Sequence, residues 1–151
     1  MIGVCRVASL VDTNVLVYCY DHSDLRKRAI ARNLLRRGAA EGLLQIPHQA
    51  LVEFVNVVTR RPIARPFLSW EEAWRQAEGL LDGFQILYPN QSVFRTAILG
   101  MAAFKIPWYD AHLWAHAEHY GLPEILSEDF QHGRWNGNVR VRNPFLELGL
   151  T

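Results

Sequence analysis

The sequence predicts an α/β protein with a central parallel sheet between two layers of helices. Short apolar runs typical of strands alternate along the chain with longer amphipathic segments typical of helices. This alternation forms βαβ units, which place the strands parallel. The first run, residues 7–11, is apolar and β-branched, as expected for a strand buried on both faces. The 151 residues suit a single domain over residues 1–151, without repeats or linkers.

The first half of the chain predicts two helices and a second strand. Asp24 can cap a helix over residues 24–37, and glycines follow its end. The predicted inner side of that helix consists of Leu25, Ala29, Leu34 and Leu35. A strand at residues 43–46 leads to a helix over residues 49–60, which Arg61-Pro62 ends. The apolar side of this helix is expected at Leu51, Val52, Val55 and Val58.

The second half continues the alternation. Ser69, followed by Glu71 and Glu72, begins a helix that runs to about residue 81. The remaining predicted elements are a strand at 84–87, helices at 92–104 and 108–120, a strand at 124–127 and, after a turn at Asn136-Gly137, an edge strand at 139–141.

The overall charge and the cysteines indicate which binding partners and which cellular compartment to expect. Lys plus Arg is 16 and Asp plus Glu is 15, which excludes a strongly basic molecule but allows a local basic face. We expect Cys5 and Cys19 to be buried free thiols, as in a reducing cytosol. Because the sequence has no signal-peptide layout and no apolar run of about 18 residues, we expect a soluble, cytoplasmic protein without membrane spans.

Four acidic residues stand at positions that need an explanation. Asp12 follows the first predicted strand and Asp129 follows the fourth. Ligands of open α/β sheets bind beyond the carboxyl ends of the strands, where the strand order reverses, so these carboxylates would face each other if the strands are neighbours. Asp110 opens the helix that precedes the fourth strand, and Glu53 interrupts an otherwise apolar stretch of helix.

Acids in apolar surroundings cost free energy, and neighbouring acids raise one another's pKa. A hard divalent cation such as Mg²⁺ relieves both costs, lowers the pKa of a bound water and neutralises a scissile phosphate. Taken singly, each acid also fits an ordinary role as a cap, a turn residue or an ion-pair partner. Taken together, the four acids predict an acidic metal site for phosphodiester chemistry.

Five segments of the chain resemble, in order, the sequence blocks of PIN domains. They are Leu-Val-Asp-Thr-Asn-Val-Leu-Val-Tyr at residues 10–18, Ala-Leu-Val-Glu-Phe at 50–54, Pro-Trp-Tyr-Asp-Ala at 107–111, Ile-Leu-Ser-Glu-Asp-Phe-Gln-His-Gly at 125–133 and Val-Arg-Val-Arg-Asn-Pro-Phe at 139–145. Each of the first four supplies one of the acids. The stand-alone domain looks most like VapC, the toxin of bacterial VapBC toxin–antitoxin pairs.

The resemblance implies a PIN-like three-layer fold and Mg²⁺- or Mn²⁺-dependent cleavage of RNA that leaves a 5′-phosphate and a 3′-hydroxyl. It implies Asp12 and Asp110 as principal metal ligands, completed by Glu53 and Asp129. Asn14 and Ser127 match polar residues that orient the acids or a water. The resemblance further implies a homodimer and a VapB-like antitoxin that blocks the acidic pocket.

Other residues are weaker candidates for function. His112, His116 and His119 share a helix face and suggest zinc, but we expect them to face solvent or a subunit contact. Trp70 and Trp74 could stack on RNA, although helix packing or a dimer contact is the favoured interpretation. The candidate RNA contacts are Arg60, Arg61, Arg65 and His132.

Two other functions compete with the ribonuclease prediction. A haloacid-dehalogenase-like phosphohydrolase also has an aspartate at the end of its first strand, but it places a second aspartate where this chain has Asn14, and no later lysine motif is evident. A non-catalytic PIN domain that binds RNA or a partner would have no evident need for the full acidic set. The sequence leaves open which RNA is cut, whether one or two ions bind, and which antitoxin is the partner.

Overall fold

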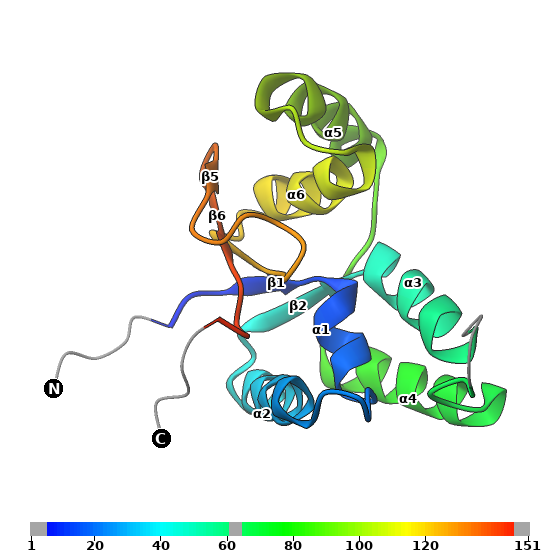
Figure 1. Ribbon diagram of the computed structural model, residues 1–151. Helices are drawn as coiled ribbons and strands as arrows, with labels where there is room; N and C mark the ends of the chain where they lie inside the picture. Colours follow the sequence, from blue (N-terminus) through cyan, green and yellow to red (C-terminus); the bar gives the residue numbers. More distant parts are fainter. Residues whose placement is uncertain (1–5, 61–64, 147–151) are drawn as a thin grey trace, which may run out of the picture.

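The computed structural model describes residues 6–60 and 65–146 and contains a six-stranded sheet with helices on both faces (Figure 1). The strands are β1 (Ser9–Val11), β2 (Leu44–Pro47), β3 (Gln85–Leu87), β4 (Glu124–Leu126), β5 (Trp135–Asn136) and β6 (Val139–Arg142). Their order is β3-β2-β1-β4-β6-β5, and every neighbouring pair is parallel except β5 with β6. The predicted mostly parallel α/β sheet is therefore confirmed.

The helices divide between the two faces of the sheet. They are α1 (Thr13–Tyr18), α2 (Leu25–Glu41), α3 (His48–Thr59), α4 (Trp70–Gly83), α5 (Gln91–Phe104) and α6 (Trp108–Tyr120). Leu10 of β1 joins the core under α5 and α6, and its neighbour Val11 joins the core formed with α1 to α4. Successive residues of a strand point to opposite faces, so β1 is buried on both sides between the two layers (Figure 1).

The strand order reverses between β1 and β4. Strand β1 pairs with β2 on one side and with β4 on the other, and the backbone N–H of Asp12 donates to the carbonyl of Leu126 at 3.0 Å. The two acid-bearing strands are thus direct neighbours, as the site prediction requires. The carboxyl ends of β1 and β4 form the crevice in which such folds bind ligands.

Side-chain caps begin the helices where the sequence predicts them. Asp24 accepts from the N–H of Lys27, and Ser69 forms a capping box with Glu72 at the start of α4. Helix α2 runs four residues past the predicted end at 37 because Gly38 stays helical. A Cβ on Gly38 would lie 2.1 Å from Cδ1 of Leu44, so glycine allows α2 to pack closely on β2.

Two predicted helix faces need correction. Leu34 and Leu35 of α2 pack against the core as predicted, whereas Leu25 and Ala29 are exposed. The buried residues of this helix are Ala31 and Gly38. The close contact with β2 at Gly38 sets the rotation of α2. In α3, Val52 is 56% exposed while Phe54 is fully buried. Spacing of apolar residues thus gave part of each buried face: Leu51 and Val58 of α3 are buried and Val55 packs against the same core, as predicted.

The sequence analysis missed two short elements, α1 and β5. Helix α1 has six residues, too few to display a helical period, and β5 has two. Because β5 pairs with the outer side of β6, the predicted edge strand is an interior strand. Cys19 is a buried free thiol as expected, and Cys5 lies outside the described residues. No helix among residues 6–60 and 65–146 is long and apolar enough to cross a bilayer.

Helix α5 packs on α6 through a glycine, and this contact is testable. A Cβ on Gly100 would lie 2.2 Å from Cζ3 of Trp114, whose indole N–H donates to the carbonyl of Asn136 at 2.9 Å. Because the ring cannot easily retreat, we expect Gly100→Ala to lower the free energy of unfolding by about 1–3 kcal/mol. The measurement is urea unfolding followed by circular dichroism.

Gly79→Ala is the matched control, since a Cβ on this helical glycine meets no atom within 4 Å. It should raise the free energy of unfolding by roughly 0.5–1 kcal/mol through helix propensity. Equal effects of the two substitutions would contradict the packing described for α5 and α6.

Candidate metal centre

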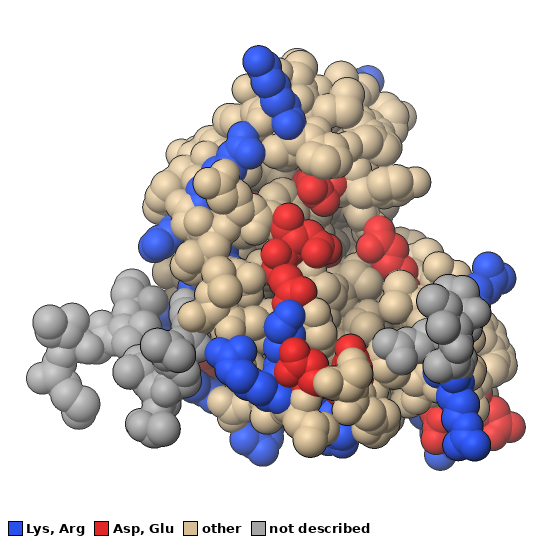
Figure 2. All heavy atoms as spheres, in the orientation of Figure 1, with Lys and Arg blue, Asp and Glu red and all other residues tan. Residues whose placement is uncertain are grey.

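Acidic side chains gather in a hollow at the centre of the face shown in Figure 2. Asp12 directly follows β1 and is the N-cap of α1, and Asp129 follows β4 by three residues. Glu53 comes from the middle of α3, and Asp110 lies in the first turn of α6. Four separate segments of the chain therefore bring the predicted acids to the carboxyl edge of β1 and β4.

Hydrogen bonds fix the orientation of the Asp12 carboxylate. Its Oδ2 accepts from the Ser127 hydroxyl at 2.6 Å, and its Oδ1 accepts from the backbone N–H of Thr13 at 2.7 Å. Ser127 is fully buried at the end of β4, so the hydroxyl is held in place by the core. The carboxylate is oriented before any ligand arrives.

Asn14 lies between the carboxylates that follow β1 and β4. Its Nδ2 is 3.2 Å from Oδ2 of Asp12, 3.3 Å from Oγ of Ser127 and 3.2 Å from Oδ2 of Asp129. Its Oδ1 accepts from the backbone N–H of Glu128 at 3.3 Å. The predicted polar residues, Asn14 and Ser127, are thus in contact with two of the four acids.

Glu53 is held by two residues that the sequence analysis did not single out. The hydroxyl of Thr13 donates to Oε2 at 2.9 Å, and the amide of Gln49 donates to Oε1 at 3.0 Å. The same Gln49 amide lies 3.5 Å from the carbonyl of Tyr109, next to Asp110. The available signals were the position of Thr13 beside Asp12 and the spacing of Gln49 one helical turn before Glu53.

The electrostatics of the cluster tie all four acids together. Burial raises the pKa of Asp12 to about 6, against the lowering effect of the Ser127 and Thr13 hydrogen bonds, and the charges of Asp129 and Glu53 raise it further. Burial, followed by the charges of Asp129 and Glu53, also raises the pKa of Asp110. Burial and the neighbouring negative charges therefore both disfavour the state in which all four acids are ionised.

The donor chemistry fits a hard divalent cation. Within residues 6–60 and 65–146, no Lys or Arg forms an ion pair with any of the four acids. No three His, Cys, Asp or Glu side chains in these ranges form a ready-made metal cage. Mg²⁺ usually takes only one or two protein carboxylates and completes its shell with water and phosphate oxygens. A set of oriented carboxylates without a counter-cation suits that mode of binding.

The predicted RNA-contact residues take no part in the hydrogen bonds around the four acids. Arg60 and Arg65 are exposed, and Arg61 lies outside the described residues. His132 uses its Nδ1 to accept from the backbone N–H of Asn143 at 2.9 Å, so it fastens the loop after β4 to the end of β6. Neither the two exposed arginines, Arg60 and Arg65, nor His132 contacts any of the four acids.

The prediction that the α6 histidines face solvent is wrong for His116, which is 1% exposed. Its Nδ1 donates to the carbonyl of His112 at 2.7 Å, and burial lowers its pKa. His112 is partly buried and only His119 is exposed. Helix α6 lies between the sheet and α5, which buries most of its circumference.

Of the two roles predicted for Trp70 and Trp74, helix packing is wrong, and a dimer contact stays a prediction. They are 69% and 62% exposed, and the indole N–H of Trp74 donates to Glu78 on the same helix at 3.1 Å. Neither ring is needed for the core of this chain.

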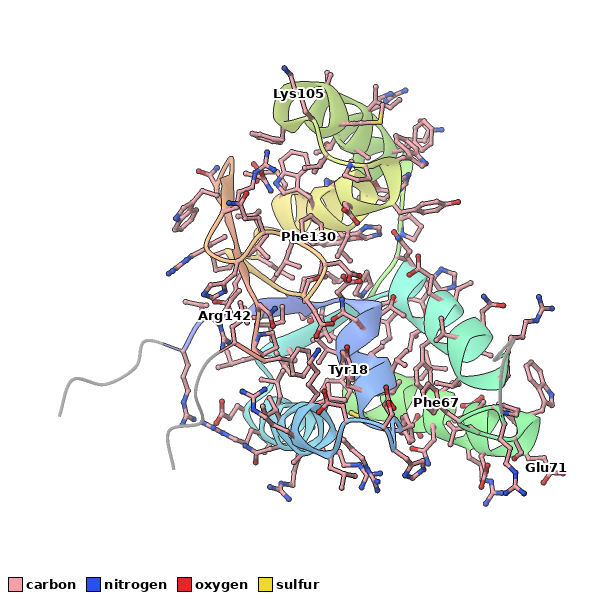
Figure 3. All side chains as sticks on the ribbon, viewed as in Figure 1. Tyr18, Phe67, Glu71, Lys105, Phe130 and Arg142 are labelled. Carbon is pink, nitrogen blue, oxygen red and sulfur yellow. The ribbon has the colours of Figure 1, made fainter. Side chains whose placement is uncertain are left out.

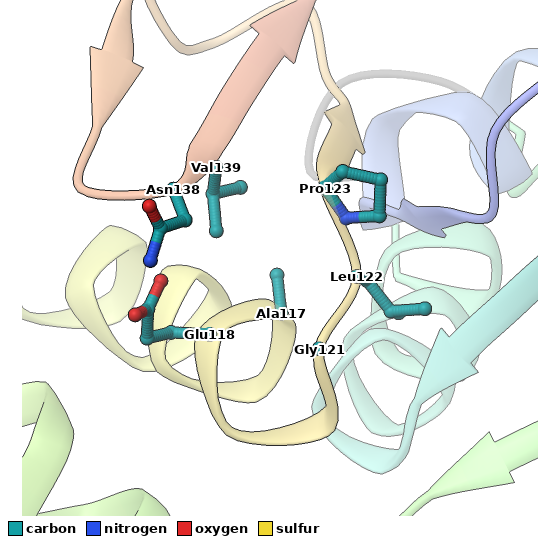
Figure 4. Close-up of a pocket in the computed structure, with 7 residues that line it drawn as sticks. All are labelled: Ala117, Glu118, Gly121, Leu122, Pro123, Asn138 and Val139. Carbon is teal, nitrogen blue, oxygen red and sulfur yellow. The ribbon is translucent and has the colours of Figure 1, made fainter.

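A separate pocket lies at the other end of α6 (Figure 4). The side chains of Glu118 and Asn138 point toward each other across it, with Leu122 and Val139 on its walls. Asp110 opens α6 and Glu118 belongs to its last turn, so the pocket and the acid cluster are at opposite ends of the helix. The pocket takes no part in the metal centre.

The amino-acid sequence is similar to those of known proteins. A family model described as the PIN domain matches residues 9–136. The ribonuclease VapC43 of Mycobacterium tuberculosis and a VapC ribonuclease of Mycobacterium bovis are each 40% identical over 113 residues, which cover 71% of this chain and 76% of each relative.

Solved structures share the fold at low sequence identity. A DNA-bound VapBC from Salmonella typhimurium gives a TM-score of 0.67 with 14% identity, over 91% of this chain and 98% of that one. A toxin–antitoxin complex from Klebsiella pneumoniae gives 0.66 with 19% identity, over 90% and 97%. VapC20 of Mycobacterium tuberculosis, described as a sarcin–ricin loop cleaving toxin, gives 0.60 with 16% identity, over 80% and 89%.

The raised pKa of Asp12 predicts how the stability of the metal-free protein depends on pH. Between its ordinary value of 3.8 and about 6, the folded protein holds a proton that the unfolded chain has released. Stability should therefore fall as pH rises through this window. Asp12→Asn removes the charge, so it should raise the free energy of unfolding at pH 7 by about 1–3 kcal/mol.

Urea unfolding in EDTA at pH 4 and at pH 7 measures this effect. The difference between Asp12→Asn and the unaltered chain should be small at pH 4 and should disappear at pH 7 in saturating Mg²⁺. An Asp12→Asn variant that is less stable at pH 7 in EDTA would show that the carboxylate is not under electrostatic strain.

Proposed function

The chain belongs to the PIN-domain family, and we propose that it is a metal-dependent endoribonuclease of the VapC type. It would hydrolyse phosphodiester bonds of RNA as the toxin of a toxin–antitoxin pair in the cytoplasm. The observation that carries this proposal is the cluster of four acids, of which Asp12, Glu53 and Asp129 accept hydrogen bonds, and which has no counter-cation among the described residues. The 40% identity to VapC ribonucleases supports it independently. Membership of the PIN family removes the haloacid-dehalogenase alternative.

We assign Asp12 and Asp110 as the principal ligands of a Mg²⁺ or Mn²⁺ ion, with Glu53 and Asp129 completing the negative site. When bound, such an ion neutralises charge on the scissile phosphate and lowers the pKa of a water molecule. The partly buried carboxylates of Asp12 and Asp110 have raised pKa values, first from burial and then from neighbouring charges. A bound cation would offset both effects, so these carboxylates favour cation binding.

The surrounding residues keep the carboxylates in position. Ser127 and Thr13 hold the two oxygens of Asp12, while Thr13 and Gln49 hold those of Glu53. Thr13 therefore connects two acids, through its backbone N–H and its hydroxyl. Hydrogen-bonded ligands need little reorganisation when substrate arrives, which is the main way an enzyme lowers an electrostatic barrier.

The partners follow from the same proposal. The neighbouring structures are VapBC and toxin–antitoxin complexes, which supports a VapB-like antitoxin as the partner that silences this chain. An exposed apolar face on α5, formed by Phe94, Ile98 and Met101 at the spacing i, i+4, i+7, supports a homodimer. Their exposed fractions run from 39% to 49%, unusual for a row of large apolar side chains on one helix face.

Removal of a single ligand carboxylate should abolish cleavage while the fold persists. We expect Asp12→Asn and Asp110→Asn to cut RNA at less than roughly 1% of the unaltered rate, because each removes charge that holds the ion. Asp82→Asn, at an exposed position of α4, is the control and should keep full activity. Structured RNA is incubated with Mg²⁺, Mn²⁺ or EDTA and the products are resolved on a gel.

Cleavage that persists in Asp12→Asn or in EDTA would refute the assignment of the site. If the unaltered chain binds RNA but cuts none in either metal, the non-catalytic PIN domain becomes the better account.

A further inference from the structure

A lysine stands beside the acidic cluster, where Lys and Arg side chains border the acidic hollow in Figure 2. Lys27, in the first turn of α2, forms an ion pair with Glu128, the residue between Ser127 and Asp129. Neither residue was singled out from the sequence, and the proposed reaction does not use them. Tyr18, the last residue of α1, is the third member of what we term the Lys27 brace.

The Lys27 brace is a closed ring of hydrogen bonds. Nζ of Lys27 donates to Oε2 of Glu128 at 2.6 Å and to the Tyr18 hydroxyl at 3.1 Å. The Tyr18 hydroxyl donates to Oε1 of Glu128 at 2.7 Å. Both oxygens of Glu128 are therefore engaged, and its side chain has one defined orientation.

The ammonium group of Lys27 also lies over two aromatic rings. Nζ of Lys27 lies 4.8 Å from the Tyr18 ring centroid and 5.7 Å from that of Phe145. The two rings meet edge to face at 4.9 Å, and Phe145 is buried. The Lys27 and Glu128 side chains are only 26% and 27% exposed, so solvent and salt screen this pair less than a surface pair.

The backbone of Glu128 connects the brace to the metal centre. Its N–H donates to Oδ1 of Asn14, whose Nδ2 contacts Asp12, Ser127 and Asp129. The N–H of Asp129 donates to the Ser127 hydroxyl at 3.1 Å. The segment 127–129 is thus fastened on one side by Asn14 and on the other by Lys27.

We propose that Lys27, acting through Glu128, is a positioning residue for the metal centre. It holds segment 127–129 so that Ser127 and Asp129 face Asp12, and it neutralises Glu128 so that a fifth carboxylate does not turn toward the ion. This inference rests on the proposed function. Residues that orient metal ligands usually affect metal affinity or turnover by 10–100-fold, although they never touch the substrate.

The experiment compares Lys27→Met, Glu128→Gln and the double variant with the unaltered chain. Methionine keeps an unbranched stem and removes the ammonium, and glutamine keeps the shape of Glu128. Lys105→Met is the matched control, because Lys105 is the only other lysine in the sequence. It is exposed at the end of α5, far from Tyr18 (Figure 3). Mn²⁺ affinity is measured by calorimetry without RNA, and kcat and KM on an RNA that the unaltered chain cuts.

We expect Lys27→Met and Glu128→Gln each to lower Mn²⁺ affinity and kcat by about tenfold, with KM changed by less than about twofold. The double variant should be no worse than the poorer single variant, because both break the same contact. Lys105→Met should match the unaltered chain. If Lys27→Met does not fold, Tyr18→Phe replaces it and should lower Mn²⁺ affinity by a smaller, measurable factor.

Unchanged Mn²⁺ affinity and kcat in Lys27→Met would overturn the proposal. It would also fail if Lys27→Met raised only KM, lowered the salt dependence of RNA binding by about one charge and left Glu128→Gln normal, since Lys27 would then contact an RNA phosphate. If the unaltered chain cuts no RNA, the proposed function fails, and the Mn²⁺ affinities alone decide on the brace.

Discussion

The need to hold four carboxylates together, partly out of water, at one edge of the sheet is the constraint on which the rest of the site depends. Acids gathered at one edge of a sheet would push apart or take up protons unless other groups held them. Here Asp12, Glu53 and Asp129 are held from different directions, by the Ser127 hydroxyl, by the N–H and hydroxyl of Thr13, and by the Asn14 and Gln49 amides. Asp110 is placed by the first turn of α6. Burial, and to a smaller extent the charges of Asp129 and Glu53, raises the pKa of Asp12, and a bound divalent cation would offset both effects.

The packing of the sheet makes that arrangement rigid. Strands β1 and β4 pair directly, and their residues Leu10, Val11, Ile125 and Leu126 are fully buried, alternating between the two cores. Because these strands are buried, the residues that immediately follow them, Asp12 and Ser127, are held in fixed positions. Helix α6 is in turn pressed between the sheet and α5, which fixes Asp110 at its first turn. The acids are thereby attached to strands and a helix that cannot move without disrupting the packing of the hydrophobic core.

The sequence carried the acids and, through the resemblance to PIN domains, Asn14 and Ser127, but it did not single out the other residues that hold the acids. Asp12 and Asp129 could be paired because strand ends and the α/β pattern predict which edge they share, and Glu53 because it interrupts an apolar helix. Gln49 and the Lys27–Glu128 pair depend on contacts between separate segments, which no periodicity reveals. His116 was misplaced for a related reason: the packing of α5 over α6 cannot be read from the pattern of α6 alone.

The central claim is that the four acids share one divalent cation, and anomalous diffraction from crystals grown with Mn²⁺ tests it directly. We expect an anomalous peak within about 2–2.5 Å of carboxylate oxygens of Asp12 and Asp110, with Glu53 and Asp129 facing the same peak. We also expect no such peak in crystals of Asp12→Asn. A Mn²⁺ ion bound elsewhere, with the acidic hollow at the carboxyl ends of β1 and β4 empty at saturating concentration, would contradict this assignment.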